Sequence, residues 1–129
     1  MSAEETARRY YETIDGDDYE SLAALLRPEF THYRPDRTLA GRETFVRFMR
    51  EERPRTDTIH AIDAVYRDVD DVESIAGDND DEAESDEVAV RGRLRAEDGR
   101  ELFGFVDVFV FEGDAVAELI TYTGSLEDR

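Results

Sequence analysis

The spacing of the apolar residues changes once along the chain, and this change constrains the fold more than any other feature. Up to Pro54 the apolar residues recur every three or four positions, as on one face of a helix. From Thr58 onward they alternate with polar residues, as in strands with one buried face. Helices grouped first and strands grouped last are typical of an α+β domain, in which the helices cover one face of an antiparallel sheet.

Three helices and one short strand are predicted before this change. Ser2 and Glu5 have the spacing of a capping box, which marks the start of a helix. Leu22, Leu25 and Leu26 form an apolar stripe in the second predicted helix. The predicted segments are a helix over Ser2–Asp15, a helix from Asp18 to Pro28, a strand over Phe30–Arg34, and a helix from Gly41 to Pro54.

Four strands are predicted after the change, joined in part by tight turns. Glu97–Gly99 and Glu112–Asp114 each contain a glycine between two alternating segments, as hairpin turns do. The predicted element order is therefore ααβαββββ. The predicted strands are Thr58–Arg67, Val88–Arg95, Arg100–Phe111 and Ala115–Thr123.

Length and composition exclude several classes of protein. A chain of 129 residues suits one domain, expected over residues 1–126 with a short tail at 127–129. The absence of cysteine excludes disulfides and thiolate chemistry. The net charge of −18 argues against nucleic acid and anionic membranes as partners, because both attract basic surfaces. We expect a soluble cytoplasmic protein, since no long apolar run is present and Met1–Tyr10 does not resemble a signal peptide.

The charged residues are unusual in kind. All 16 basic residues are arginine, and they face 34 acidic residues. An acidic surface without lysine is expected in a cytoplasm rich in salt, where screening keeps a highly charged protein compact. A GC-rich genome would explain the arginines but not the acids, so we favour the adaptation to salt.

One segment, Asp70–Glu87, carries ten of the acidic residues and no basic one. The run Asp78-Asn79-Asp80 has the carboxylate density that divalent cations prefer, but the segment lacks the sixth-position glycine and the closing glutamate of an EF-hand loop. We therefore expect a flexible, solvated loop.

Three stretches of the chain resemble a known family. They are Tyr10–Leu22, with Gly16-Asp17 between two helices; Leu39–Glu43, with Gly-Arg-Glu at the start of the third helix; and Val106–Gly113 followed by Ile120-Thr121-Tyr122. Their order resembles the NTF2-like superfamily, in its SnoaL-like and ketosteroid-isomerase-like branch. This resemblance implies a cone of three N-terminal helices packed on a strongly curved antiparallel sheet, a pocket inside the cone, and a homodimer. It implies no cofactor.

The resemblance also assigns site residues. Tyr10 falls on the position of an oxyanion-binding tyrosine, and Asp107 on that of an aspartate kept protonated by apolar surroundings. Alternation agrees for Asp107, because it places this carboxylate on one strand face in a row of four phenylalanines, where burial should raise its pKa. The alternative is that the face is simply core, with Asp107 at a wetter end or hydrogen-bonded to Tyr10. The residues expected to line the pocket are Phe103, Phe105, Phe109, Leu119 and Thr121.

The general base of the family is missing from its usual place. The family has an aspartate before the proline of the first short strand, and this chain has Arg34 before Pro35. Arginine stays protonated, so it is a candidate anchor for an anionic group and not a base. His32 should share its face and is the candidate base; the alternative is a half-buried structural histidine. A metal site built on His32 and His60 is not expected, because no third ligand is evident.

Two functions remain open at this stage. One is an isomerase or cyclase that acts on a small apolar carbonyl compound, with Tyr10, His32 and Asp107 as catalytic residues. The other is a dimeric module that holds a small apolar or anionic ligand, or supports an assembly, without turnover. In either case we expect a homodimer formed through the outer face of the sheet, since no helix remains to cover it.

Overall fold

The computed structural model describes residues 2–52, 58–67 and 85–124. Their elements form helices followed by a sheet, as the sequence predicts. Most of the acidic segment, residues 70–84, lies outside the described residues, and Ser85–Glu87 belong to a strand. The elements are α1 (Ala3–Asp15), α2 (Tyr19–Ala24), β1 (Leu26–Tyr33), β2 (Thr38–Ala40), α3 (Arg42–Arg47), the π-helical turn η1 (Phe48–Glu52), β3 (Thr58–Arg67), β4 (Ser85–Ala96), β5 (Glu101–Glu112) and β6 (Ala115–Gly124).

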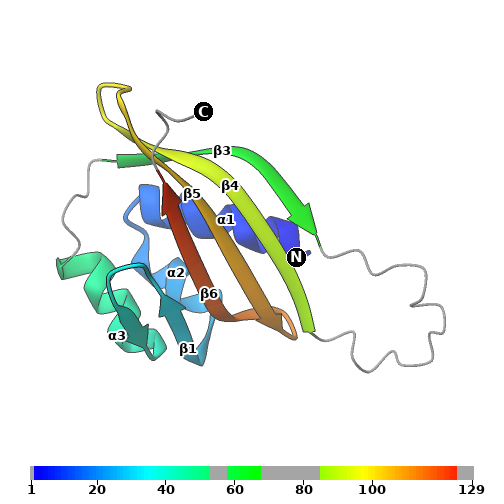
Figure 1. Ribbon diagram of the computed structural model, residues 1–129. Helices are drawn as coiled ribbons and strands as arrows, with labels where there is room; N and C mark the ends of the chain where they lie inside the picture. The colour runs from blue at the N-terminus through cyan, green and yellow to red at the C-terminus, as the bar shows by residue number, and fades with distance from the viewer. Residues whose placement is uncertain (1, 53–57, 68–84, 125–129) are drawn as a thin grey trace.

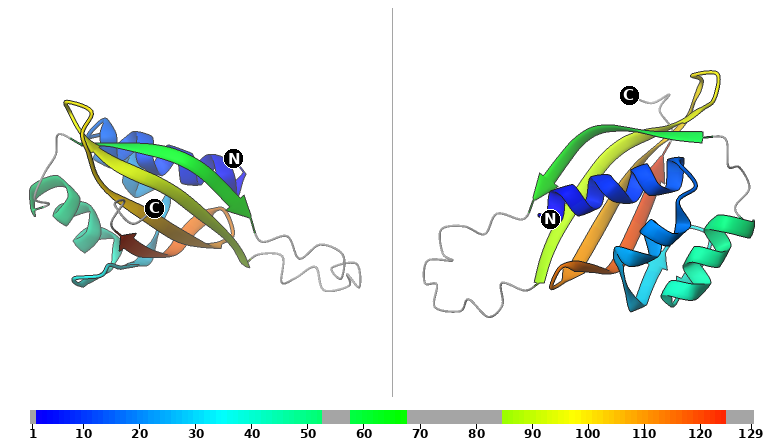
Figure 2. Two further views of the ribbon diagram at one scale, coloured as in Figure 1. Left: turned by 45° about the horizontal axis from the view of Figure 1, so that its top comes forward. Right: turned by 180° about the vertical axis from the view of Figure 1, so that it is seen from behind.

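The sheet has six strands in the order β2-β1-β6-β5-β4-β3, and it is not closed. It curls around α1, which lies across its inner face, while α2 and α3 cover the end near β1 (Figures 1 and 2). All neighbouring strands are antiparallel except β1 and β6, which run parallel. The α+β fold is confirmed, and the purely antiparallel sheet of five strands is corrected to a mixed sheet of six.

The second helix is shorter than predicted. Leu25 is its C-cap, and Leu26 already belongs to β1, where it lies beside Val116 of β6. Pro28 disfavours helical backbone at the preceding residue, and the parallel partner strand supplies the hydrogen bonds that the helix would have made. Strand β2 was also missed, because three residues are too few to show a period.

The local signals of the first helix are confirmed. The Ser2 hydroxyl accepts from the Glu5 backbone N–H at 3.1 Å, and the Glu5 carboxylate accepts from the Ser2 backbone N–H at 3.0 Å. Asp18 caps α2 as predicted. Strand β3 has the predicted bounds, and the turns at Gly99 and Gly113 have the positive φ that favours glycine.

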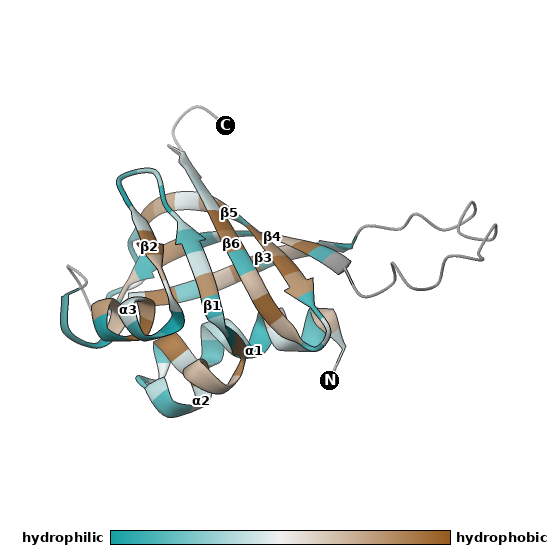
Figure 3. Ribbon diagram, turned by 90° about the horizontal axis from the view of Figure 1, so that it is seen from below, coloured by the Kyte–Doolittle hydropathy of each residue, from teal (hydrophilic) through white to brown (hydrophobic). Residues whose placement is uncertain are grey.

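The core lies between α1 and the inner face of the sheet. Tyr10 and Tyr11 of α1 pack edge-on against Phe109 of β5, and Phe45 of α3 packs against Phe30 of β1. Figure 3 shows hydrophobic positions along the strands and a hydrophilic loop between β1 and β2. Among the described helices, none is both long and apolar enough to cross a bilayer.

Gly92 of β4 allows one close contact in this core. A Cβ at this position would stand 2.5 Å from the Ala61 carbonyl oxygen and 2.7 Å from the Phe105 ring. The ring of Phe105 can therefore lie directly on the backbone of β4. This contact fixes one wall of the space between the sheet and α1.

Candidate functional site

A cavity of about 270 Å³ lies between α1 and the inner face of the sheet. Its walls come from α1, β1, η1, β3, β4, β5 and β6, together with the turn after β1. Apolar side chains form most of its surface. The polar or charged side chains that line it are Tyr10, His32, Arg34, Thr58, His60, Asp107, Thr121 and Thr123.

Asp107 is the buried carboxyl of this cavity. It lies on the inward face of β5, where every second residue from Phe105 to Phe111 is buried, and only 6% of it is exposed. The Tyr11 hydroxyl donates to its Oδ2 at 2.6 Å, and the Thr121 hydroxyl donates to its Oδ1. Burial raises the pKa of Asp107, and the two hydrogen bonds oppose this rise without cancelling it.

His32 of β1 is the histidine next to this carboxyl. Its Nε2 lies 2.8 Å from the Thr121 hydroxyl, so Thr121 bridges His32 and Asp107. Burial and, secondly, the charge of Arg34 lower the pKa of His32 to about 3. The imidazole is therefore neutral over the physiological range, and its buried Nδ1 has no hydrogen-bond partner among the described residues.

Arg34 lies at the wall of the cavity and not beside Asp107. Its Nε pairs with the Asp36 carboxylate at 3.3 Å, and its guanidinium carbon lies 5.1 Å from the centre of the Phe48 ring. Arg37 stacks on the same ring at 5.0 Å. The ion pair of Arg34 with Asp36 thus lies within the turn between β1 and β2. The side chains that donate hydrogen bonds to Asp107, Tyr11 and Thr121, are both neutral hydroxyls.

A second histidine and carboxylate face the cavity from β3 and α1. The Nδ1 of His60 lies 2.7 Å from Oδ1 of Asp15, and the His60 backbone N–H donates to Oδ2 of Asp15 at 3.0 Å. From the sequence, His60 was considered only as a metal ligand, and its pairing with Asp15 was not predicted. The two residues are 45 positions apart, so only the fold brings them together. The described residues contain no group of three or more side chains placed to hold a metal ion.

These features can be compared with known proteins. Residues 7–119 match the family described as the SnoaL-like domain. The chain belongs to the SnoaL-like family. Among curated proteins, none matches it significantly.

Solved structures share the SnoaL-like fold at low sequence identity. One is an NTF2-like protein of unknown function from Cytophaga hutchinsonii, with a TM-score of 0.72 and 10% identity, covering 96% of this chain and 91% of that one. A candidate polyketide cyclase from Sinorhizobium meliloti has a TM-score of 0.69 and 12% identity, covering 92% and 94%. The Orange Carotenoid Protein of Anabaena (Nostoc), described as binding canthaxanthin, has a TM-score of 0.68 and 16% identity, covering 90% of this chain and 35% of that one. At these identities the likeness concerns the fold alone.

The SnoaL-like domain places most of the predicted site residues around one cavity. Tyr10, His32, Arg34, Phe103, Phe105, Asp107 and Thr121 line it. Phe109 and Leu119 are fully buried in the core and are not among its lining residues. The hydroxyl bonded to Asp107 belongs to Tyr11 and not to the expected Tyr10, which is one residue earlier. Successive residues of a helix are rotated by about 100° about its axis, so the two side chains leave α1 in different directions.

Proposed function

We propose that this SnoaL-like domain binds a small apolar carbonyl compound in the cavity and catalyses its isomerisation or cyclisation by proton transfer. One observation carries the proposal: a carboxyl with a raised pKa, Asp107, lines a mainly apolar cavity and is held by Tyr11 and Thr121. A carboxyl that keeps its proton can donate a hydrogen bond to an oxygen that becomes negative during the reaction.

The chemistry follows from this donor. When a base removes a proton from the carbon next to the carbonyl, the C–H electron pair moves toward the carbonyl oxygen and an enolate forms. Asp107 would stabilise this oxygen, and Tyr10, which lines the same cavity, would be a second donor. Arg34 would anchor an anionic end of the ligand. Return of the proton to another carbon completes an isomerisation. In a cyclisation the enolate carbon attacks a second carbonyl, the π pair of that carbonyl moves to its oxygen, and the resulting alkoxide takes up the proton. The cavity needs no added cofactor for these steps.

The predicted base, His32, stays a prediction. A pKa of about 3 makes the neutral imidazole available at all ordinary pH values, but it also makes that imidazole a weak base. Its contact with Thr121 favours a different contribution, which is to order the donors around Asp107.

Binding of 4-nitrophenol tests the oxygen site, because its phenolate resembles an enolate. We expect Asp107→Leu to weaken binding by about tenfold or more, since the donor to the oxygen is lost. Asp107→Asn keeps a donor and should lie between this variant and the wild type. The matched control is Asp63→Asn, on the outer face of the sheet. Equal affinity in wild type and Asp107→Leu would contradict the proposal.

A second candidate function is a ligand-binding module without turnover. It is supported by Arg34 at the family's base position and by the low basicity of His32. The fold likeness to a protein described as binding canthaxanthin is consistent with it. This module would bind phenols through Asp107 but show no proton abstraction from carbon, so a turnover assay separates it from the enzyme.

The assembly and the setting of the domain belong to the proposal as well. The outer face of the sheet carries three half-buried valines on β5, and its exposed Tyr66 and Tyr122 lie beside Ala89 and Val106. A second copy of the chain would cover this face.

The acidic, lysine-free composition supports a cytoplasm rich in salt. Melting temperatures that rise with KCl concentration are expected, and equal stability at low and molar KCl would contradict the adaptation to salt.

A further inference from the structure

Asp15 holds His60 at two points. The carboxylate, at the end of α1, meets Nδ1 of the ring through Oδ1 at 2.7 Å and the backbone N–H of the same residue through Oδ2 at 3.0 Å. Strand β3 is an edge of the sheet, so the second contact satisfies a backbone donor at that edge. A single carboxylate thereby fixes both the position and the orientation of the imidazole.

This contact also selects the tautomer of the ring. The Asp15 carboxylate only accepts hydrogen bonds, so Nδ1 of the neutral His60 must carry the proton. The lone pair then lies on Nε2, the nitrogen that acts as a base in other histidine–aspartate pairs. The same logic selects the opposite tautomer for His32. The Thr121 hydroxyl gives its one proton to Asp107, so it accepts from Nε2 of His32, and the lone pair of that ring lies on the buried Nδ1.

The ring of His60 lies in the same cavity as Asp107. Its centre is 5.1 Å from that of Tyr11, the donor to Asp107, and 5.6 Å from that of Phe105. The order of the strands places His32 on β1 and His60 on β3, on opposite sides of Asp107 on β5. A small carbonyl compound whose oxygen reaches Asp107 can thus have a carbon near His60.

The two histidines differ in access to water. The side chains of His60 and Asp15 are 16% and 21% exposed, whereas His32 as a whole is 3% exposed. A base must exchange its proton with substrate or solvent in each cycle, and a partly exposed imidazole can do so.

We infer that His60, positioned by Asp15, is the general base of the cavity and takes a proton from the carbon next to the carbonyl group that Asp107 binds. This inference rests on the proposed function. Nε2 receives the proton, the C–H electron pair forms the enolate, and the protonated imidazole returns the proton to the product carbon. Asp15 stabilises the charged imidazole between these steps and keeps its tautomer, so it is a positioning residue. The groups that face His60 are Asp15 and Tyr11 of α1 and Asp107 of β5.

Nitrogen-15 NMR of the histidine-labelled chain tests the tautomer without any turnover. In the wild type, His60 should carry its proton on Nδ1 and leave Nε2 bare. In Asp15→Asn the amide can donate to Nδ1, so the proton should move toward Nε2, while Asp15→Glu should restore the wild-type pattern. A wild-type His60 with its proton on Nε2 would overturn the inference whatever the turnover.

The reaction test uses 5-nitrobenzisoxazole, a flat apolar carbon acid. A base takes the ring C–H proton, the C–H electron pair forms a nitrile, and the N–O bond breaks to release a phenolate. We expect His60→Ala and His60→Gln to lose about 100-fold or more of the wild-type rate, and Asp15→Asn to lose about tenfold. His32→Ala should lose about tenfold at most, because it disturbs the donors around Asp107 without removing the base. The control Asp63→Asn should leave the rate unchanged.

The outcomes separate the two proposals. Loss of the rate in His32→Ala with retention in both His60 variants would overturn the inference and leave the proposed function standing, with His32 as the base. A wild type no faster than buffer would overturn the proposed enzyme itself, and the inference with it. Circular dichroism of each variant establishes that a lost rate is not a lost fold.

Discussion

The Tyr11 hydroxyl donates to Oδ2 of Asp107 at 2.6 Å, and both groups are buried. A donor to a carboxylate stabilises its charged form, so this bond lowers the pKa of a group that burial raises. Tyr11→Phe should therefore raise the pKa of Asp107 further, as followed by carboxyl carbon-13 NMR. Tyr33→Phe, at an exposed tyrosine, is the control. An unchanged Asp107 pKa in Tyr11→Phe would mean that the hydroxyl does not bind the carboxyl in solution.

His32 should make the fold sensitive to acid. Its pKa is about 3 in the folded chain against 6.5 ordinarily, so the unfolded chain takes up this proton first as the pH falls. The contribution of His32 to stability is complete above pH 6.5 and declines between pH 6.5 and 3, by about 1.4 kcal/mol per pH unit at most.

Urea unfolding of wild type and His32→Gln between pH 7 and 4 checks this expectation. Other titrating groups contribute equally to the unfolding free energies of the two proteins, so their effect cancels in the difference. One of these groups is Asp107, whose raised pKa acts in the opposite sense and favours folding at low pH. The wild type should lose more stability than the variant. Parallel pH profiles would show that His32 is not buried as a neutral ring.

Gly92→Ala should destabilise the domain. The added Cβ would meet both the Ala61 carbonyl oxygen and the Phe105 ring, so the backbone or the ring must move. Overpacking of this kind costs about 1–3 kcal/mol, and the shifted Phe105 should also weaken ligand binding in the cavity. Gly124→Ala, where the new Cβ would meet nothing within 4 Å, is the control for urea unfolding. Equal stability of the two variants would refute the tight contact.

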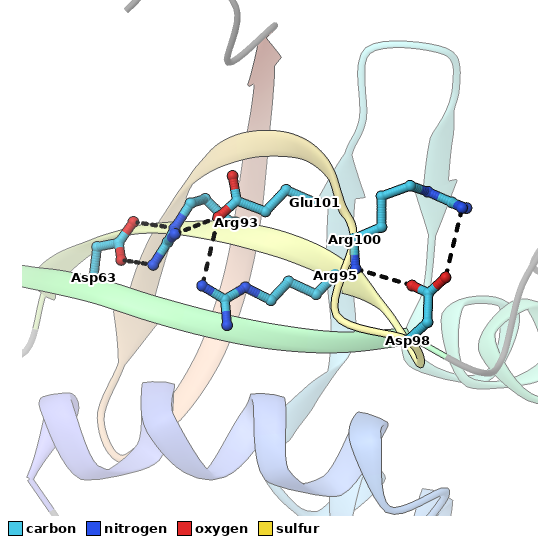
Figure 4. A network of polar contacts seen from close by, with 6 residues as sticks. All are labelled: Asp63, Arg93, Arg95, Asp98, Arg100 and Glu101. Atoms are coloured by element: carbon cyan, nitrogen blue, oxygen red, sulfur yellow. Dashed lines mark hydrogen bonds and ion pairs between the residues drawn. The ribbon is translucent and has the colours of Figure 1, made fainter.

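The outer face of the sheet should form a homodimer. A polar network occupies part of this face: Arg93 of β4 pairs with Asp63 of β3 and Glu101 of β5, on the side of the sheet away from α1 (Figure 4). Tyr122 of β6 is 60% exposed on the same face. Sedimentation in molar KCl should give twice the monomer mass for the wild type and the monomer mass for Tyr122→Glu. Arg9→Glu, on α1, should stay dimeric, and a monomeric wild type would exclude the dimer.

The sequence predicted the parts of the fold that depend on local patterns. Ser2 and Glu5 cap α1, the glycines mark the turns, and the alternation along β5 placed Asp107 on a buried apolar face. These features depend on residues a few positions apart. The parallel pairing of β1 with β6 depends on segments about 90 residues apart, for which no local pattern exists.

Only part of the candidate site was predicted, because some of its contacts join segments that are far apart in the sequence. Asp107, Arg34 and His32 were found because a strand period or a family motif includes them. The choice of Tyr11 over Tyr10 as the partner of Asp107 depends on the rotation of α1 against the sheet. The pairing of Asp15 with His60 depends on how the end of α1 meets an edge strand, so it became visible only in the fold.

The pKa of Asp107 tests the central claim most directly. Carboxyl carbon-13 NMR of the wild type, titrated in molar KCl, should give a pKa above the usual 3.8, because burial outweighs the hydrogen bonds from Thr121 and Tyr11. A carboxyl with a raised pKa holds its proton more strongly than an exposed one, and in its protonated form it can donate a hydrogen bond to a ligand oxygen. A pKa below 3.8 would show a stabilised carboxylate that can only accept, and it would contradict the proposed catalysis at this cavity.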